Sequence, residues 1–373
     1  MSRASIKPKS QVLQYAWHHI PNEGIRPPGY CRIVVVGIGG AGNNTVTRLS
    51  EMGIKGAETI AINTDILHLN ASRATHKILI GEKITRGLGA GGDPALGRAA
   101  IEESKKRLEE LFTGVDVAFI TAGLGGGTGT GAAPVLAEIA RRKGAITIGV
   151  VTTPFRIEKG RIEIAAYGLT EMRRECDTVV VIDNNKLMQL VPQLPINEAF
   201  RVADQVLANM IKGIVETISM PSLINLDFAD FKTIVKRGGV AIVGLGESDA
   251  PNRAEEAVRN ALRNPLLDVD YAGATGALIH VCGDNQMTIE EANRVAEIVT
   301  EVMDDDALVI WGARINPELN GLLRVTLVMT GVNSPYILSG FGTIAPQLYD
   351  LEPYSEPEKP LKLDLPLYQI ENY

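Results

Sequence analysis

Two glycine-rich segments each follow an apolar, β-branched run, and their residue types are suited to holding phosphate groups. The first reads GIGGAGNN at residues 37–44, directly after residues 33–36, and the second reads GLGGGTGTG at residues 123–131, after residues 117–121. Glycine lets the backbone approach a phosphate closely, and a helix that opens after such a segment offers free N–H groups and a partial positive charge. The spacing therefore predicts two nests of backbone amides at strand ends.

The first segment alone leaves two kinds of ligand open. It satisfies GxGxxG, and Asp65 follows the next strand at about the distance expected in a dinucleotide-binding fold, so an NAD-linked oxidoreductase is one alternative. The second segment favours a triphosphate, because a dinucleotide needs no second nest and a triphosphate carries more charge. Thr128 and Thr130 add hydroxyl donors there.

The way in which the phosphate charge is balanced is also constrained. The sequence contains neither GxxxxGKS nor GxxxxGKT, so it is not a P-loop nucleotide hydrolase. Neither principal nest holds a lysine. Amides, helix dipoles and a metal ion must therefore meet the charge, and Mg²⁺ is the expected partner of a triphosphate.

A third glycine cluster, GLGAGGD at residues 87–93, leads into a predicted helix near Pro94. Two interpretations stay open for it. It either closes over a terminal phosphate or forms a mobile surface loop.

Hydrolysis of a triphosphate requires a group that positions water in line with the terminal phosphate, and the nests contain no obvious base. The candidate is NLDFAD at residues 225–230. Its apolar residues can anchor the segment while Asn225, Asp227 and Asp230 point elsewhere. Asp230 alternatively caps the short helix that follows.

Composition excludes several classes of function. The net charge of −7 and the pI of about 5.4 argue against nucleic acid as a main partner. No apolar run approaches the roughly 18–20 residues of a membrane span, so direct membrane insertion is not expected. The three cysteines, Cys31, Cys176 and Cys282, are far apart and form no CxxC pair, which fits a reducing cytoplasm.

The elements that position the nests are predicted from residue 32 onward. Apolar, β-branched runs predict strands at 33–36, 59–62, 78–80, 117–121, 146–151 and 179–182, and helices between them include 43–51, 96–112 and 132–143. Runs that are apolar on both faces and separated by helices indicate a parallel sheet covered on both sides. A doubly wound α/β domain is therefore predicted.

A long helix and a smaller domain follow. Apolar residues recur at three- and four-residue steps over residues 196–219, between Pro195 and Pro221, which predicts a helix that joins two domains. The strands and helices beyond it indicate an α+β layer with a mixed sheet. The predicted division is an N-terminal extension (1–30), a nucleotide-binding domain (31–195), the central helix (196–221), a C-terminal domain (222–334) and a disordered, proline-rich, acidic tail (335–373).

The order of these motifs resembles the tubulin/FtsZ family. GGAGNN after the first strand and GLGGGTGTG after the fourth carry the resemblance, and the form GGGTGTG is closer to FtsZ than to tubulin. It continues through NTD at 63–65, the GLGAGG loop and NLDFAD at 225–230, and it covers about residues 31–332. IWGA at 310–313 is similar to archaeal members. The resemblance implies a GTPase.

The resemblance also assigns nucleotide contacts. The glycine loops would surround the phosphates, a glutamate and an arginine would contact ribose and phosphates, and an aromatic ring with two polar side chains would hold guanine. These residues are Gly39, Gly40, Ala41, Gly42 and Asn43 at the α- and β-phosphates; Asn63 and Asp65 after the second strand; Ala90, Gly91 and Gly92 near the γ-phosphate; Gly123, Gly125, Gly126, Gly127, Thr128, Gly129 and Thr130 along the phosphate chain; Glu158 and Arg161; and Phe200, Asn184 and Asp204 at guanine. Arg161 stands one residue closer to the glutamate than is usual in the family.

Self-assembly follows from the same resemblance. In the family, the NLDFAD loop reaches the nucleotide of the next subunit, so the expected partner is a second copy in a head-to-tail contact that builds filaments. The expected cofactors are GTP or GDP with Mg²⁺, with potassium as an alternative cation. A GTP-binding regulator that does not polymerise is a further alternative.

The C-terminal tail ends in LDLPLYQI at residues 363–370, a short apolar peptide after an acidic linker. It resembles a partner-docking motif. The resemblance implies that the tail recruits membrane-tethering or division proteins. It also implies a cytoplasmic location at the division site, on the inner face of the membrane.

Overall fold

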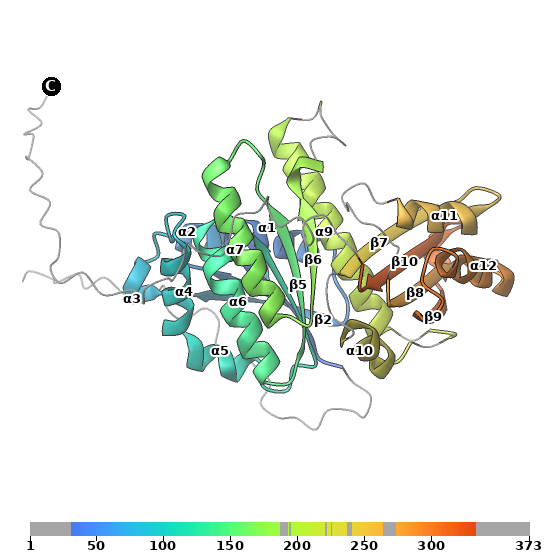
Figure 1. Cartoon of the computed structure of the whole chain (residues 1–373), viewed down its shortest axis with the longest axis horizontal. Helices are drawn as coiled ribbons and strands as arrows, with labels where there is room; N and C mark the ends of the chain where they lie inside the picture. Colours follow the sequence, from blue (N-terminus) through green and yellow to red (C-terminus); the bar gives the residue numbers. More distant parts are fainter. Residues whose placement is uncertain are drawn as a thin grey trace, which may run out of the picture.

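The computed structural model describes residues 31–186, 193, 195–220, 222–224, 226–236, 241–263 and 274–332. Figure 1 shows two domains side by side, with the long helix α9 (Ile196–Ser219) running between them. No helix in these ranges is both long enough and apolar enough to cross a membrane.

The larger domain is built on a six-stranded parallel sheet in the order β3-β2-β1-β4-β5-β6. Its strands are β1 (Ile33–Ile38), β2 (Ala57–Asn63), β3 (His76–Leu79), β4 (Val117–Gly123), β5 (Ile146–Thr153) and β6 (Thr178–Asp183). All residues of β1, β5 and β6 are buried. Helices on both faces explain why these strands carry continuous Val and Ile runs rather than an alternating pattern.

Helices form two layers around this sheet. They are α1 (Gly39–Glu51), α2 (Ile66–Ala71), α3 (Glu82–Thr85), α4 (Pro94–Glu103), α5 (Lys105–Leu111), α6 (Gly127–Arg142) and α7 (Lys159–Glu175). One buried cluster packs α4, α5, α6 and α7 against one face of the sheet. A second cluster packs α1 and α9 against the other face.

Helix α9 belongs to the cores of both domains. Its buried residues Leu207, Ile211 and Ile214 share a cluster with the first sheet and with Val243 and Leu278 of the second sheet. The two sheets are therefore connected through a continuous apolar core.

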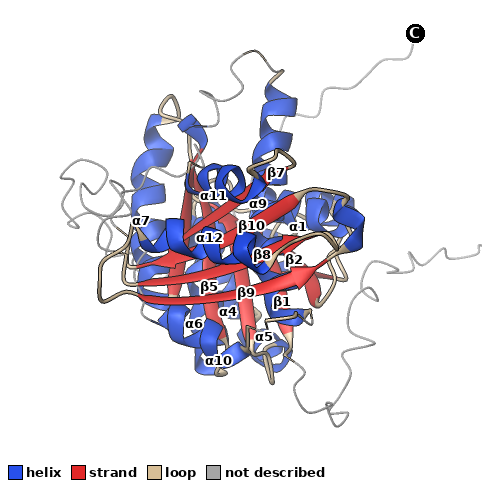
Figure 2. Cartoon of the chain, turned by 90° about the vertical axis from the view of Figure 1, so that its right-hand side faces the viewer, coloured by secondary structure: helices blue, strands red, loops and turns tan. Residues whose placement is uncertain are grey.

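The second domain holds a mixed sheet in the order β7-β10-β8-β9, in which β10 is antiparallel to β7 and β8 while β8 and β9 are parallel. The strands are β7 (Ala241–Ser248), β8 (Gly276–Gly283), β9 (Leu308–Ile315) and β10 (Leu323–Thr330); the helices are α10 (Phe228–Lys236), α11 (Arg253–Leu262), α12 (Ile289–Thr300) and the short 3-10 helix η1 (Pro317–Leu319). Figure 2 shows α11 and α12 crossing in front of these strands, and both helices share a core with them.

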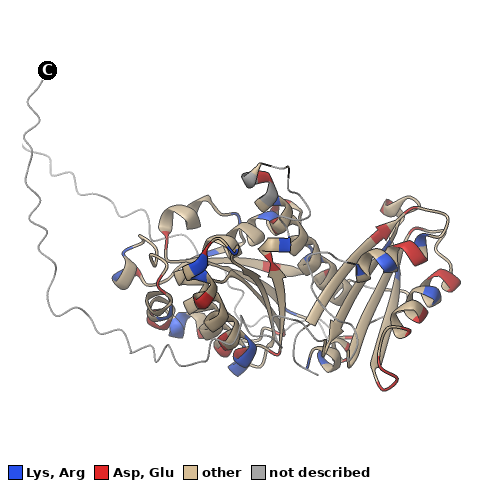
Figure 3. Cartoon of the chain, turned by 45° about the horizontal axis from the view of Figure 1, so that its top comes forward, with Lys and Arg blue, Asp and Glu red and all other residues tan. Residues whose placement is uncertain are grey.

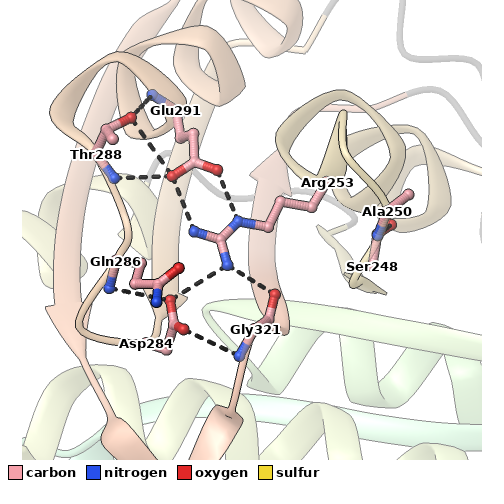
Figure 4. Close-up of polar contacts among 8 residues, drawn as sticks. All are labelled: Ser248, Ala250, Arg253, Asp284, Gln286, Thr288, Glu291 and Gly321. Atoms are coloured by element: carbon pink, nitrogen blue, oxygen red, sulfur yellow. Dashed lines mark hydrogen bonds and ion pairs between the residues drawn. The ribbon is translucent and has the colours of Figure 1, made fainter.

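One arginine joins α11, α12 and the turn before β10. Arg253 donates from Nε and Nη2 to both carboxylate oxygens of Glu291, at 2.7 and 3.1 Å, and from Nη1 to Asp284 and to the carbonyl of Gly321 (Figure 4). Glu291 also completes a capping box with Thr288 at the start of α12, as predicted. The Arg253 hydrogen bond holds the pKa of Glu291 below its usual value. The helical layer is thus fixed at one edge of the sheet.

Charged residues lie mostly on the helices and loops, whereas most of the length of the strands is free of them (Figure 3). Positively and negatively charged residues occur together on α7 and on α11. Arg141 and Arg174, for example, pair with Glu175.

The predicted fold class is confirmed: a doubly wound parallel-sheet domain is joined by a long central helix to a smaller domain with a mixed sheet. The helix predicted over residues 96–112 is two helices, because Ser104 leaves helical geometry with φ −97° and ψ 3°. Helices α1 and α6 begin at Gly39 and Gly127, earlier than the predicted starts at residues 43 and 132. The glycines form their first turns despite low helix propensity. Residues 1–30 and the tail at 335–373 lie outside the described residues.

Candidate functional site

The two glycine-rich segments meet at the carboxyl edge of the parallel sheet. β1 and β4 are neighbours, with Ile38 opposite Ala122, and both strands end at this edge. Helix α1 begins at Gly39 and α6 begins at Gly127, so the free N–H groups of two first turns lie close together. In this strand order, the boundary between β1 and β4 is the switch point at which doubly wound sheets open a ligand crevice.

Glycine is required where these loops touch. A Cβ on Gly42 would lie 2.3 Å from the carbonyl oxygen of Thr121, and one on Gly39, whose φ is +70°, would lie 3.0 Å from the nitrogen of Gly129. No side chain fits the first of these gaps. A Cβ on Gly126 would meet nothing within 4 Å, so the start of α6 is open on that side.

Hydrogen bonds from buried polar side chains hold the loops together. Asn43 is buried, and with its amide oriented to suit its neighbours it donates to the carbonyl of Gly37 at 2.9 Å and accepts from Asn63 at 3.1 Å. The hydroxyls of Thr64 and Thr128 lie 2.7 Å apart. These contacts tie together the loops after β1, β2 and β4. The side chains of Asn43 and Asn63 therefore shape the loops, leaving backbone groups to face a ligand.

Thr130 acts within its own loop. Its hydroxyl oxygen accepts a hydrogen bond from the N–H of Gly125 at 2.9 Å, and the residue is fully buried. Gly125 itself lies against the backbone of Arg161, because a Cβ there would be 2.9 Å from the Arg161 carbonyl oxygen. The second glycine loop is thus held between its own helix and the start of α7.

The third glycine cluster lies against the second. A Cβ on Gly127 would meet the backbone nitrogen of Asp93 at 2.7 Å. Ala90 is buried at this contact, whereas Gly91 and Gly92 are exposed and have φ of +56° and +85°. Asp93 caps α4 by accepting from Ala95. The tip of this loop is therefore free to face a ligand beside the second nest.

Asp65 has a local role that a dinucleotide fingerprint does not predict. Its Oδ1 accepts from the backbone N–H groups of Leu67 and His68, at 2.9 and 3.1 Å, so it is the N-cap of α2. In a dinucleotide site this carboxylate would instead bind ribose. Its use as a cap weakens the dinucleotide alternative.

Aromatic and charged residues stand at the predicted base and ribose positions. Phe200 is 41% exposed near the start of α9, and its ring meets the edge of Phe155 at 5.5 Å between centroids. Glu158 accepts from Arg161 at 2.7 Å and from the backbone of Phe155 at 3.0 Å. Asn184 follows β6 and is partly buried. Phe155 is not among the predicted site residues, although its position shortly after β5, at the carboxyl edge of the sheet, was a signal.

Asp204, one turn along α9 from Phe200, is the unusual carboxylate of the site. Burial raises its pKa to about 7, against the opposing positive charge of Arg48 on α1. It accepts no hydrogen bond from the described residues, and Arg48 Nε is likewise buried with no partner among them. A partly buried carboxylate with unused acceptor atoms is suited to a ligand that brings its own donors.

The predicted catalytic loop lies elsewhere. Leu226 is buried and anchors the loop. Asp227 is exposed, and its carboxylate caps α10 by accepting a hydrogen bond from the N–H of Asp230 at 2.7 Å. The carboxylate of Asp230 accepts a longer hydrogen bond, at 3.4 Å, from the N–H of Asp227. Asn225 lies outside the described residues. Both carboxylates thus have oxygen atoms available at the surface.

The described residues form no metal cage at the glycine loops. Among the described residues there is no group of three or more His, Cys, Asp or Glu that could hold a metal ion. A cleft of about 820 Å³ does exist, but it lies between the domains, lined by residues such as Lys212 and Arg314. The glycine loops carry the chemistry, and we therefore place the candidate site there.

Two family models match the chain. The tubulin/FtsZ family GTPase domain matches residues 32–192, and the C-terminal domain of the FtsZ family matches residues 239–333. The first match contains all three glycine loops. The second contains the mixed sheet.

Characterised relatives match over most of their length. Cell division protein FtsZ 2 of Methanocaldococcus jannaschii is 58% identical over 83% of this chain and 82% of its own. Cell division protein FtsZ 1 of Thermococcus kodakarensis is 50% identical over 90% and 88%. A solved FtsZ dimer of M. jannaschii, described as empty, superposes with a TM-score of 0.77 at 53% identity, covering 81% of this chain and 88% of that one.

Proposed function

The chain belongs to the tubulin/FtsZ family, and on that premise we propose that it is a self-assembling GTPase that hydrolyses GTP at the contact between successive subunits of a filament. The proposal extends to cell division, the role named for its relatives, with the filament forming part of the division ring.

The separation between the nucleotide loops and the catalytic loop carries this proposal. Phe200 near the start of α9 contacts Phe155 after β5, so this end of α9 lies at the carboxyl edge of the sheet. Ser219 at the other end lies against Gly56, just before β2, which places it at the opposite edge. A helix of 24 residues is about 36 Å long. Figure 1 shows α10, which follows the catalytic loop, at the lower end of α9.

A single molecule therefore keeps Asp227 and Asp230 away from its own glycine loops. If these carboxylates act on a nucleotide, the nucleotide belongs to another copy. The contact this requires is head to tail, so it repeats without closing and yields a filament. A related protein of Haloferax volcanii, 23% identical, is described as a GTPγS-bound protofilament, which is consistent with assembly in this fold.

Binding would depend on backbone groups and five side chains. The amides at the starts of α1 and α6 would hold the phosphates, and the tip at Gly91 and Gly92 would lie near the terminal one. Phe200 would pack on guanine. Asp204 would accept from guanine N1–H and the 2-amino group, a donor pair that adenine lacks, with Asn184 beside it. Glu158 and Arg161 would contact ribose and phosphates.

Hydrolysis would use the neighbouring subunit. Asp227 and Asp230 of that subunit would polarise the attacking water in line with the terminal phosphate. The expected Mg²⁺ would neutralise charge on the phosphates, since Mg²⁺ in such sites is commonly bound through substrate phosphates rather than by a dedicated protein cage. We also propose that residues 363–370 of the tail recruit membrane-tethering or division proteins.

The test is GTP turnover of the full chain measured against protein concentration. Catalysis in trans predicts that specific activity rises steeply above a threshold concentration, with sedimentable polymer appearing at the same threshold in GTP but not in GDP. Constant specific activity on dilution would contradict the shared site. Turnover without polymer would favour the non-polymerising regulator, and copurified NAD would favour the oxidoreductase.

A further inference from the structure

His68 on α2 is a polar residue beside the first glycine loop that the predicted site does not include. The Asp65 cap starts α2 directly after the loop that follows β2, and it places His68 in the first turn. The residue is half-buried, and its side chain makes no hydrogen bond or ion pair within the described residues.

The two ring nitrogens of His68 have different surroundings. Nδ1 is buried and has no partner, whereas Nε2 is not buried in this way. A buried N–H without an acceptor is rarer in proteins than an acceptor that lacks a donor. We therefore assign the hydrogen of the neutral ring to Nε2, which leaves Nδ1 as the unprotonated nitrogen. His68 then offers one available donor, at Nε2.

That donor faces the phosphate loop. Among the described residues, and apart from the backbone of the helix to which Gly40 belongs, His68 Nε2 is the one atom within 4 Å of the position that a Cβ on Gly40 would occupy, at 3.8 Å. Gly40 is exposed, and no other described side chain lies within 4 Å of that position. The imidazole therefore borders the same space as the amides of the first turn of α1.

We propose that His68 Nε2 donates a hydrogen bond to the phosphate chain of the bound guanine nucleotide. It would supply a side-chain donor to a nest that contains no lysine and whose Asn43 side chain is directed into the scaffold. A phosphate oxygen is a strong acceptor, so a single charge-assisted bond contributes measurably to affinity. This inference rests on the proposed function, since it requires a nucleotide at the glycine loops.

The test compares affinities of the full chain for GDP and for guanosine, measured by competition against a fluorescent guanine nucleotide. His68→Leu removes the donor and keeps an apolar side chain, and His68→Gln keeps a donor. We expect His68→Leu to weaken GDP binding about tenfold or more and to leave guanosine binding unchanged. His68→Gln should recover part of the loss. Asn70→Ala, an exposed change on the same helix, should bind both ligands as the unaltered chain does.

Several outcomes would overturn the inference. GDP binding by His68→Leu that equals that of the unaltered chain would do so directly. An equal loss of GDP and guanosine affinity would show that His68 only packs α2. If the unaltered chain bound no guanine nucleotide, the proposed function would fall as well, whereas normal binding that His68 does not affect would remove this inference alone.

Discussion

The two ends of α9 differ in the kind of surface that they present to a nucleotide. At the N-terminal end, glycine loops pack against one another so closely that Gly42 and Gly39 have little room for a side chain, and the exposed Phe200 contacts Phe155 at the same edge of the sheet. At the C-terminal end, Asp227 and Asp230 cap a short helix and keep carboxylate oxygens at the surface. Recognition is thus suited to a rigid edge of buried strands, and the proposed chemistry to an exposed segment.

Under the proposed function, this difference between the two ends is the reason why one chain would not hydrolyse GTP alone. A rigid backbone nest can bind phosphates without a charged side chain, but it contains no group that activates water. The exposed loop has such groups, but it has no phosphate-binding surface of its own. Each end supplies what the other lacks, and α9 holds the two apart at a fixed distance because it is packed into both cores.

The largest effect is expected from Asp227→Ala. We expect GTP turnover to fall about 100-fold or more, because the water-activating group is lost, while nucleotide content stays unchanged. The variant also loses the α10 cap, which costs about 1 kcal/mol of stability. Turnover and bound nucleotide are measured on the same samples above the assembly threshold.

A matched control separates the cap from the chemistry. Thr288→Ala removes the capping box of α12, far from the proposed contact, and should lose similar stability with normal turnover. If Asp227→Ala lost nucleotide binding to the same degree as turnover, the division between the two ends would be wrong.

The next effect is expected from Gly42→Ala at the rigid edge. The new Cβ would lie 2.3 Å from the carbonyl oxygen of Thr121, so α1 must shift away from β4 and the amides move with it. Overpacking of this kind costs about 1–3 kcal/mol, and we expect GDP affinity to fall roughly tenfold or more. Gly160→Ala, where the Cβ meets nothing within 4 Å, is the matched control and should bind normally. Normal GDP affinity in Gly42→Ala would show that the edge is not rigid.

The edge could be predicted from the sequence because its signals are local. Continuous apolar runs indicate buried parallel strands, and glycines directly after them indicate nests, so the fold class and the positions of the loops follow from short segments. The start of α12 was predictable for the same reason, since Thr288 and Glu291 are three residues apart.

Contacts between distant segments could not be predicted in this way. Asn43 and Asn63 are predicted nucleotide contacts, and the sequence does not indicate the hydrogen bond between their side chains. The spacing of Asp65 indicates a ribose contact but does not indicate that its carboxylate caps α2. The pairing of Phe155 with Phe200 depends on where α9 packs against β5. Such roles are set by tertiary neighbours, which spacing along the chain does not encode.

The smallest effect concerns pH and the carboxylate at the rigid edge. Burial raises the pKa of Asp204 to about 7, so about half of the nucleotide-free molecules carry this proton at pH 7. The contribution of this group to stability is fully present below its ordinary pKa near 3.8 and is lost as the pH rises through about 7. Guanine needs the ionised carboxylate as acceptor, and binding should therefore release the proton.

Guanosine is the ligand of choice for this measurement, because it carries no phosphate that titrates in the same range. We expect its affinity to fall about tenfold between pH 8 and pH 6, and calorimetry in buffers of different ionisation enthalpy to detect about half a proton released at pH 7. The Asp204→Asn variant should bind guanosine more weakly, and it should show neither the pH dependence of affinity nor the release of a proton. Identical pH profiles in the two proteins would show that Asp204 does not contact the base, and the recognition half of the comparison would then rest on backbone and aromatic groups alone.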